Sequence, residues 1–175
     1  MSKTLKSRWW WFICYPDSLP DNWIDILMIT GIPFIVSPIH DKDIATDGTY
    51  KKPHYHCIVV FDNPTTYNHV LTNCCKPLNA TIPQVILNLS GAVAYLTHKG
   101  NNDKAQYNLD DVRCFNGSHV YLKDNDYIDD VYSAIESIII NECPCNLRAL
   151  LLRCQSIPDA VPIIRSHAYY WRSLL

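Results

Sequence analysis

The sequence predicts an α+β fold, in which a ferredoxin-like, split βαβ antiparallel sheet is followed by a small all-α domain. The first observation is the order of short apolar runs and amphipathic segments before residue 125: strand, helix, strand, strand, helix, strand, helix. The second is a change of pattern after Asn125, where apolar residues recur at helical spacing. We therefore expect two domains, residues 1–124 and residues 125–175.

The strands are predicted from apolar, aromatic and β-branched runs that end at turn residues. Arg8–Tyr15 (RWWWFICY) stops at Pro16, and HCIVVF follows a lysine-rich loop. The four strands are expected at residues 8–15, 32–39, 56–61 (starting near His54) and 83–89. In this topology the first and third strands are central, and the second and third form a hairpin. The long loop of residues 40–53 then connects the end of the second strand to the start of the third at one end of the sheet.

The helices are predicted from capping residues and helical periodicity. Pro20, Asp21 and Asn22 resemble a helix start that Gly31 ends, and Ser90 is the expected N-cap of a short helix that stops at Gly100. The remaining helix of the first domain is expected at residues 65–75. Three further helices are expected in the tail, at residues 126–140, 145–154 and 162–175.

The composition is that of a globular protein, with 48% hydrophobic and 18% charged residues. No apolar run reaches the roughly 18 residues of a membrane span, and no secretion signal is recognisable. Eight cysteines without such a signal, and without paired CxxC motifs, favour reduced thiols. We therefore expect a cytoplasmic protein with no membrane partner.

The charge distribution is more informative than the net charge of −2. Up to Lys123 there are 11 basic and 10 acidic residues, whereas from Asp124 there are 4 basic and 7 acidic residues. Several acidic residues of the first part lie beside a group of histidines, where a bound cation would make the site electropositive. The near-neutral total therefore does not exclude a phosphate-binding site.

The histidine group lies in the stretch SPIHDKDIATDGTYKKPHYHCIVVF, residues 37–61. Residues two apart on a strand share a face, so His54 and His56 project side by side. His40 and Asp43 approach from the other arm of the hairpin. One divalent ion such as Mn²⁺, Mg²⁺, Co²⁺ or Zn²⁺ could then have three imidazoles and a carboxylate, with an open position for a substrate oxygen.

The competing interpretation is that HxH in a strand is incidental, as it more often is when it occurs alone. His40 and Asp43 within reach of the hairpin favour the metal site. Asp41 is the alternative carboxylate, although it could equally cap the loop. Lys51 and Lys52 could be solvated loop charges or could reach a phosphate.

Three motifs in order, SPIHDKD, YKKPHYHCIVVF and AYLTHKG, resemble the HUH endonucleases. They are most similar to the Rep initiators of rolling-circle plasmids of the RepB kind. The resemblance covers roughly residues 8–107, and YPDSLP and VILNL also fit it. The helical tail resembles the oligomerisation domain of that family more weakly.

The resemblance implies a metal-dependent, site-specific DNA nickase with strand-transfer activity. It places the metal ligands on His40, Asp43, His54 and His56. It implies one bound divalent ion, for which Mn²⁺ and Mg²⁺ are the first candidates. It places the nucleophile on Tyr95, which would form a 5′-phosphotyrosyl link and release a 3′-OH. From the residues alone Tyr95 could be a core residue, and Tyr107 is the second candidate nucleophile.

The implied partners are origin DNA, bound both as duplex and as an unpaired or hairpin strand at the nick, and the host replication machinery. A homo-oligomeric ring through the C-terminal helices is implied as well, in a bacterial cytoplasm that carries the plasmid. Phosphate contacts would come from basic residues and one histidine. The candidates are Arg8, Lys51, Lys52, His98, Lys99, Lys104 and Arg113, with Lys3 and Lys6 in addition.

Three other functions stay open on the sequence. A relaxase or transposase of the HUH type would use the same metal site, although the YLTH context argues against it. A DNA-binding repressor stabilised by metal would bind the origin without cutting it. A small-molecule metallohydrolase is disfavoured because no HExxH helix is present.

Overall fold

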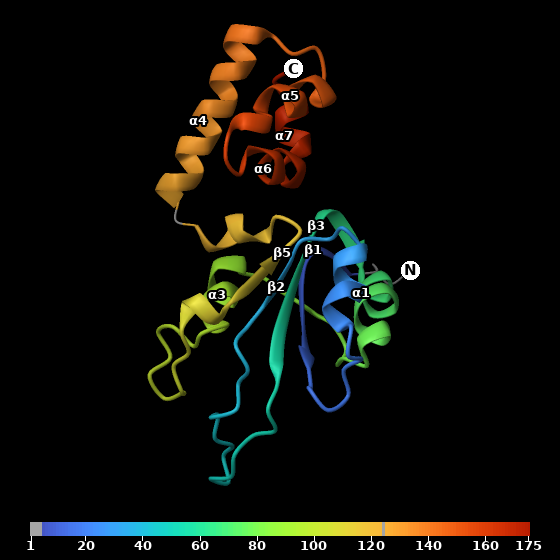
Figure 1. Ribbon diagram of the computed structural model, residues 1–175, viewed down its shortest axis with the longest axis vertical. Coiled ribbons are helices and arrows are strands. Elements are labelled where there is room, and N and C mark those ends of the chain that lie inside the picture. Colours follow the sequence, from blue (N-terminus) through green and yellow to red (C-terminus); the bar gives the residue numbers. More distant parts are fainter. Residues whose placement is uncertain (1–4, 124) are drawn as a thin grey trace. The chain divides into compact units, whose positions relative to one another are not determined.

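The computed structural model describes residues 5–123 and 125–175 (Figure 1). The chain divides into two compact units between Ser118 and His119. The first contains the sheet and the second is helical, in agreement with the predicted α+β class. Each unit has its own buried apolar core, so each is described by itself.

The first unit is built on one five-stranded sheet in the order β4-β1-β3-β2-β5, with every neighbouring pair antiparallel. The strands are β1 (Lys6–Cys14), β2 (Phe34–Val36), β3 (Tyr55–Thr66), β4 (Gln84–Val85) and β5 (Arg113–Phe115). The long pair β1 and β3 lies at the centre, as the split βαβ pattern predicted. Its register shifts between Ser7 and Trp9.

The observed strands differ from the predicted bounds. β2 covers only three of the predicted residues 32–39, and β3 runs from Tyr55 to Thr66 rather than over residues 56–61. The run PQVILNL gives only a two-residue strand, β4, because Leu87 is exposed and Asn88 begins the next helix. The edge strand β5 was not predicted. It has only three residues, too few to show alternation, and it is followed by Asn116 and Gly117 with positive φ.

One face of the sheet carries the apolar core of this unit. Trp10 and Phe12 of β1, Phe34 of β2, and Cys57 and Val59 of β3 are buried there. The helices α1 (Trp23–Ile29) and α2 (Tyr67–Val70) contribute Leu27 and Val70 to the same core. The predicted helix of residues 65–75 is irregular, because α2 continues as a π-turn (Leu71–Cys75) and a 3₁₀ turn (Lys76–Leu78).

The opposite face carries His54 and His56 and is approached by α3 (Leu89–Tyr95). The N-cap of α3 is Asn88 rather than the predicted Ser90, because the Asn88 side chain accepts a hydrogen bond from the Gly91 N–H at 3.1 Å. The helix ends at Tyr95, earlier than predicted. Residues 37–54 form a hairpin beyond the sheet, held by bridges His40–His54 and Ile44–Tyr50 (Figure 1).

After α3, short 3₁₀ turns at Leu109–Asp111 and Ser118–Leu122 flank β5, and the second of them leads into the second unit. The described residues of the second unit also contain four α-helices and a 3₁₀ turn at Cys154–Ser156. The helices are α4 (Asn125–Glu142), α5 (Leu147–Arg153), α6 (Ala160–Ser166) and α7 (Ala168–Ser173). The predicted last helix is therefore broken, and the break falls at His167, whose φ of −122° and ψ of 33° are not helical.

The helical unit packs the apolar side of α4 against its own core, with two residues buried and others, such as Ile128 and Ile138, partly buried. Val131 and Ile135 pack with Leu150, Ile164 and Trp171 there. In the described part of the chain, no helix combines the length and the apolar character that a membrane span requires.

Candidate metal and nuclease site

Three buried histidines meet at the end of the β2–β3 hairpin. His54 is just before β3, and His56 is its second residue; His40 faces His54 through backbone hydrogen bonds of 2.8 and 3.3 Å. The ring centroids lie 5.4 Å apart for His40 and His54, 4.8 Å for His40 and His56, and 5.0 Å for His54 and His56. The hairpin register thus gathers three imidazoles into one group.

Backbone carbonyls fix the protonation of two of these rings. His40 Nε2 donates to the Leu96 carbonyl at 2.9 Å, and His54 Nδ1 donates to the Lys52 carbonyl at 2.8 Å. A carbonyl oxygen can only accept, so these nitrogens carry the hydrogens. The other nitrogen of each ring therefore keeps its lone pair. A ligand histidine usually has such a carbonyl behind it.

The lone pairs converge where water is excluded. One nitrogen from each of the three rings lies within 4.8 Å of the others. In the described chain, His40 Nδ1 and His56 Nδ1 are buried without a hydrogen-bond partner. Leaving such a group unpaired costs about 1–3 kcal/mol, so a bound cation would remove an existing penalty.

Burial keeps His40 and His56 neutral at physiological pH. Burial lowers the pKa of His40 to about 4, although the bond to the Leu96 carbonyl acts in the opposite direction. Burial also lowers the pKa of His56 to about 3, and the neighbouring histidines add to this. A neutral imidazole is the form that binds a metal.

Asp43 and His98 extend the group on the other side of His40. One ligand atom from each of His40, Asp43 and His98 lies within 4.8 Å of the others. Asp43 Oδ2 is 3.9 Å from His40 Nδ1, and Asp43 Oδ1 is 3.6 Å from His98 Nδ1. The two groups share His40, and between them they contain all four residues predicted as metal ligands. We name the five residues His40, Asp43, His54, His56 and His98 the ligand cluster.

His98 lies inside this cluster rather than on the surface. Its Nδ1 donates to the Ala105 carbonyl at 2.7 Å, and its buried Nε2 has no hydrogen-bond partner in the described chain. Its ring centroid is 4.4 Å from that of His40. The residue follows α3 with a φ of 58°. A fully buried side chain is poorly placed to contact DNA, so its geometry suits a ligand better.

Tyr95, the candidate nucleophile, is the last residue of α3 and borders the ligand cluster. Its ring centroid is 5.3 Å from that of His56 and 5.0 Å from that of His98. Lys104 donates a hydrogen bond to the Tyr95 hydroxyl, and its Nζ lies 4.5 Å from the centre of the ring. The bond from His40 to the carbonyl of Leu96, the next residue, ties the end of α3 to the cluster.

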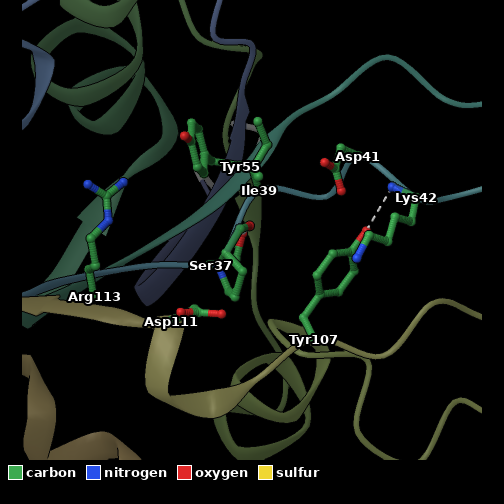
Figure 2. Close-up of a pocket in the computed structure, with 9 residues that line it drawn as sticks. Ser37, Ile39, Asp41, Lys42, Tyr55, Tyr107, Asp111 and Arg113 are labelled. Atoms are coloured by element: carbon green, nitrogen blue, oxygen red, sulfur yellow. Dashed lines mark hydrogen bonds between the residues drawn. The ribbon is translucent and has the colours of Figure 1, made fainter.

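Tyr107, the second candidate nucleophile, forms a wall of the cluster. Its ring stacks on His40, with centroids 4.4 Å apart and planes 6° apart. Its hydroxyl accepts a hydrogen bond from the Lys42 N–H at 3.1 Å (Figure 2). Burial raises the pKa of Tyr107. This hydroxyl is engaged with the loop backbone, whereas that of Tyr95 is held by a cation.

The remaining basic residues predicted to contact DNA are dispersed. Arg8 Nε donates to the Phe61 carbonyl at 3.2 Å, and Lys52 pairs with Asp17 at 2.7 Å. Arg113 lies near the rings of Trp23 and Tyr55. Lys6, Lys51 and Lys99 are exposed, and Lys3 lies outside the described residues. Of the predicted set, the structure brings His98 and Lys104 to the ligand cluster.

The tryptophans alternate across the sheet as a strand requires. Trp10 is buried in the core, and its Nε1 donates to the Ser7 carbonyl at 2.9 Å. Trp11 faces the other way and stacks on His56, with centroids 5.5 Å apart and planes 17° apart. Trp11 also touches the Tyr95 ring edge to face. It therefore borders the ligand cluster from β1.

Sequence reasoning missed the link between Lys104 and Tyr95. Lys104 lies nine residues beyond Tyr95, in a loop that carries no periodic pattern. The loop is folded back by the bond from the Tyr107 N–H to the Thr97 carbonyl at 3.1 Å. No local signal in the sequence indicates this return.

Comparisons with known proteins identify the family of the chain. The model of the family described as "Plasmid replication protein, origin binding domain" matches residues 2–121. The chain is 42% identical over 112 residues to Replication protein RepB of Lactiplantibacillus plantarum and 36% identical over 118 residues to a Replication protein of Staphylococcus aureus. It is 33% identical over 120 residues to Replication protein RepB of Streptococcus agalactiae.

These alignments cover 64%, 67% and 63% of this chain, respectively, but only 50%, 59% and 57% of the relatives. The chain thus spans little more than half the length of the curated relatives it matches. The family match covers more than half of the chain and includes the whole ligand cluster, Tyr95 and Lys104. The chain therefore belongs to the family of plasmid replication proteins that carry this origin-binding domain.

Proposed function

We propose that this protein initiates rolling-circle replication of a plasmid by cutting one strand of the origin through a tyrosine nucleophile. One observation carries the proposal. The Tyr95 hydroxyl is held by Lys104 beside buried histidine nitrogens that have lone pairs and no protein partner among the described residues. This is the arrangement that metal-assisted attack on a phosphodiester needs.

The ligand cluster fits a divalent cation. Imidazole nitrogens of His40, His54 and His56 form one close group, and His40 also belongs to a second group with Asp43 and His98. The family resemblance assigns His40, Asp43, His54 and His56 to the ion. Mn²⁺ accepts mixed nitrogen and oxygen ligands, whereas Mg²⁺ prefers oxygen, so we propose Mn²⁺ first and Mg²⁺ second. The bound ion would draw charge from a nonbridging phosphate oxygen and align the phosphate for in-line attack.

Tyr95 then supplies the nucleophile. A bond forms between its phenolic oxygen and phosphorus, and the bond from phosphorus to the 3′ oxygen breaks. The phenolic proton leaves to solvent, and the departing 3′ oxygen takes one up, so the products are a 5′-phosphotyrosyl link and a free 3′-OH. Attack by a 3′-OH on this link reverses the step and rejoins a strand.

Lys104 assists in two ways. Its ammonium group fixes the position of the Tyr95 hydroxyl, and its charge favours the negative oxygen that develops during attack. His98 and Trp11 pack against the Tyr95 ring and limit its rotation. Tyr95 is partly exposed, so a DNA strand can reach it.

The substrate is origin DNA that is unpaired at the cut, such as the loop of an extruded hairpin. Neighbouring duplex would be bound through phosphates by dispersed lysines and arginines. The 3′-OH would serve as a primer for the host replication machinery in the bacterial cytoplasm. A relaxase or transposase role would use the same chemistry on other DNA.

We also propose that the helical unit assembles the protein into a ring. Val131 and Ile135, which recur at helical spacing in α4, are buried in the core of the unit and so are not available as an interface. The proposal now rests on large exposed side chains, namely Ile140, Leu152 and Tyr169. A ring would bring several copies of Tyr95 to one origin and so supply a second nucleophile.

The test is to incubate the full chain with Mn²⁺ and a single-stranded oligonucleotide that carries its origin. The wild type should form a covalent adduct that maps to Tyr95 by mass spectrometry. Tyr95→Phe removes one oxygen and should bind DNA and metal without forming an adduct. DNA attached to Tyr107 would refute the choice of nucleophile. Tight binding without any adduct would instead indicate a repressor that does not cut.

A further inference from the structure

A cavity lies next to the ligand cluster and is lined in part by Tyr107. Its volume is about 360 Å³, and it opens between the chain that leaves β2 and the chain that enters β5. Six of the residues that line it bear on its chemistry: Ser37, Asp41, Tyr55, Tyr107, Asp111 and Arg113 (Figure 2). None of them belongs to the ligand cluster.

Tyr107 borders both the cavity and the ligand cluster. One side of its ring stacks on His40, and its hydroxyl is tied to the backbone of Lys42, which also lines the cavity. The cavity therefore begins one ring away from a proposed metal ligand. A DNA strand with its phosphate at the cluster would have a neighbouring nucleotide within reach of this cavity.

The charges of the lining are balanced. Asp41 and Asp111 oppose Lys42 and Arg113, so a phosphate would meet as much repulsion as attraction. A flat, uncharged ring with its own donors and acceptors fits better. Tyr55 and the planar guanidinium of Arg113 offer surfaces on which such a ring can lie; the guanidinium carbon is 5.6 Å from the centre of the Tyr55 ring.

Asp111 is the residue best placed to select a base. Asp111 lines the cavity from an exposed position, and in the described part of the chain its carboxylate has no hydrogen-bond or ion-pair partner, so it is free to bind a ligand. A carboxylate accepts hydrogen bonds from the amino groups of cytosine, adenine or guanine. Thymine has no amino group and offers only one ring N–H.

We propose that this cavity binds one unpaired nucleobase beside the nick and that Asp111 makes it prefer bases with an amino group over thymine. The inference rests on the proposed function in that an unpaired DNA strand is the substrate. It adds a specificity site that is separate from the nucleophile and the metal ligands.

The test measures base preference in the full chain carrying Tyr95→Phe, so that no strand is cut. Fluorescence anisotropy with Mn²⁺ gives the Kd for labelled dA12, dC12 and dT12 at one salt concentration. We expect dA12 and dC12 to bind more tightly than dT12. Adding Asp111→Asn should lower the ratio of the dT12 Kd to the dC12 Kd by about fivefold or more.

Asp110→Asn is the matched control, because Asp110 is adjacent and equally charged but does not line the cavity. It should strengthen binding to all three oligonucleotides alike, through charge alone. If Asp111→Asn does the same and leaves the ratio unchanged, the base site is refuted. Asp111→Asn could change the ratio of the dT12 Kd to the dC12 Kd while the wild type forms no covalent adduct with origin DNA. That result would support the base site and refute the nicking proposal.

Discussion

The two faces of the segment formed by His54 and β3 are both buried, but their side chains differ in chemistry. Cys57 and Val59 point into the apolar core and are at most 1% exposed, whereas His54 and His56 point the other way and are 7% and 4% exposed. The side chains of the first face need only apolar packing contacts. The second holds nitrogens without hydrogen-bond partners in the described chain, at a cost in stability. The difference supports our proposal that the buried His54 and His56 hold a ligand rather than stabilise the fold.

The largest expected effect comes from the histidine face. His54→Ala or His56→Ala should lower the nicking rate at least about 1,000-fold, because a metal ligand is lost and metal assistance supplies several kcal/mol. Stability and most duplex binding should be retained, since an unpaired polar group is removed. Nicking and circular dichroism melting measure the two effects. His69→Ala, at an exposed site, is the control. Full nicking by the His54→Ala, His56→Ala double variant would refute the role of this face.

Lys104→Met should have the next largest effect, on the reaction and not on the fold. Losing the cation that holds the Tyr95 hydroxyl should slow single-turnover cleavage about 10- to 100-fold at saturating DNA. The Kd for DNA should change less than about threefold. Lys104→Arg should restore part of the rate, because arginine also donates, and Lys76→Met on an exposed turn should have no effect. A weaker Kd with an unchanged rate would make Lys104 a DNA contact instead.

Val59→Ala probes the apolar face and should invert this pattern. Deleting buried methyl groups from the core should lower the free energy of unfolding by about 1–3 kcal/mol in urea titrations. Below its melting temperature the variant should cut at close to the wild-type rate. A loss of nicking in a variant that remains fully folded would show that the two faces are not separable.

The smallest effect on nicking is expected from removing the helical unit. A chain that ends at Asp124 retains the sheet, the ligand cluster and Tyr95, so it should cut a single-stranded oligonucleotide at the full rate. Light scattering should find this chain monomeric and the full chain in a higher oligomer. A full chain that stays monomeric at tens of micromolar, with and without DNA, would refute ring assembly through the helical unit.

The sequence predicted the central strands and the proximity of the four proposed ligands, because both depend on short-range patterns. Alternation on a strand places His54 and His56 together, and hairpin register brings His40 opposite them. Three features had no comparable signal. The strand β5 is too short to alternate, Lys104 reaches Tyr95 through an irregular loop, and the helix break at His167 occurs without proline or glycine. These depend on tertiary contacts, which periodicity does not encode.

The most direct test of the account is to measure Mn²⁺ binding by electron paramagnetic resonance in the full chain. The wild type should bind one Mn²⁺ per chain, and Tyr95→Phe should bind it equally well. The His54→Ala, His56→Ala double variant should lose binding, whereas Val59→Ala, on the opposite face of the same strand, should keep it. Equal Mn²⁺ binding by the wild type and the double variant would contradict the claim that the histidine face is a metal site.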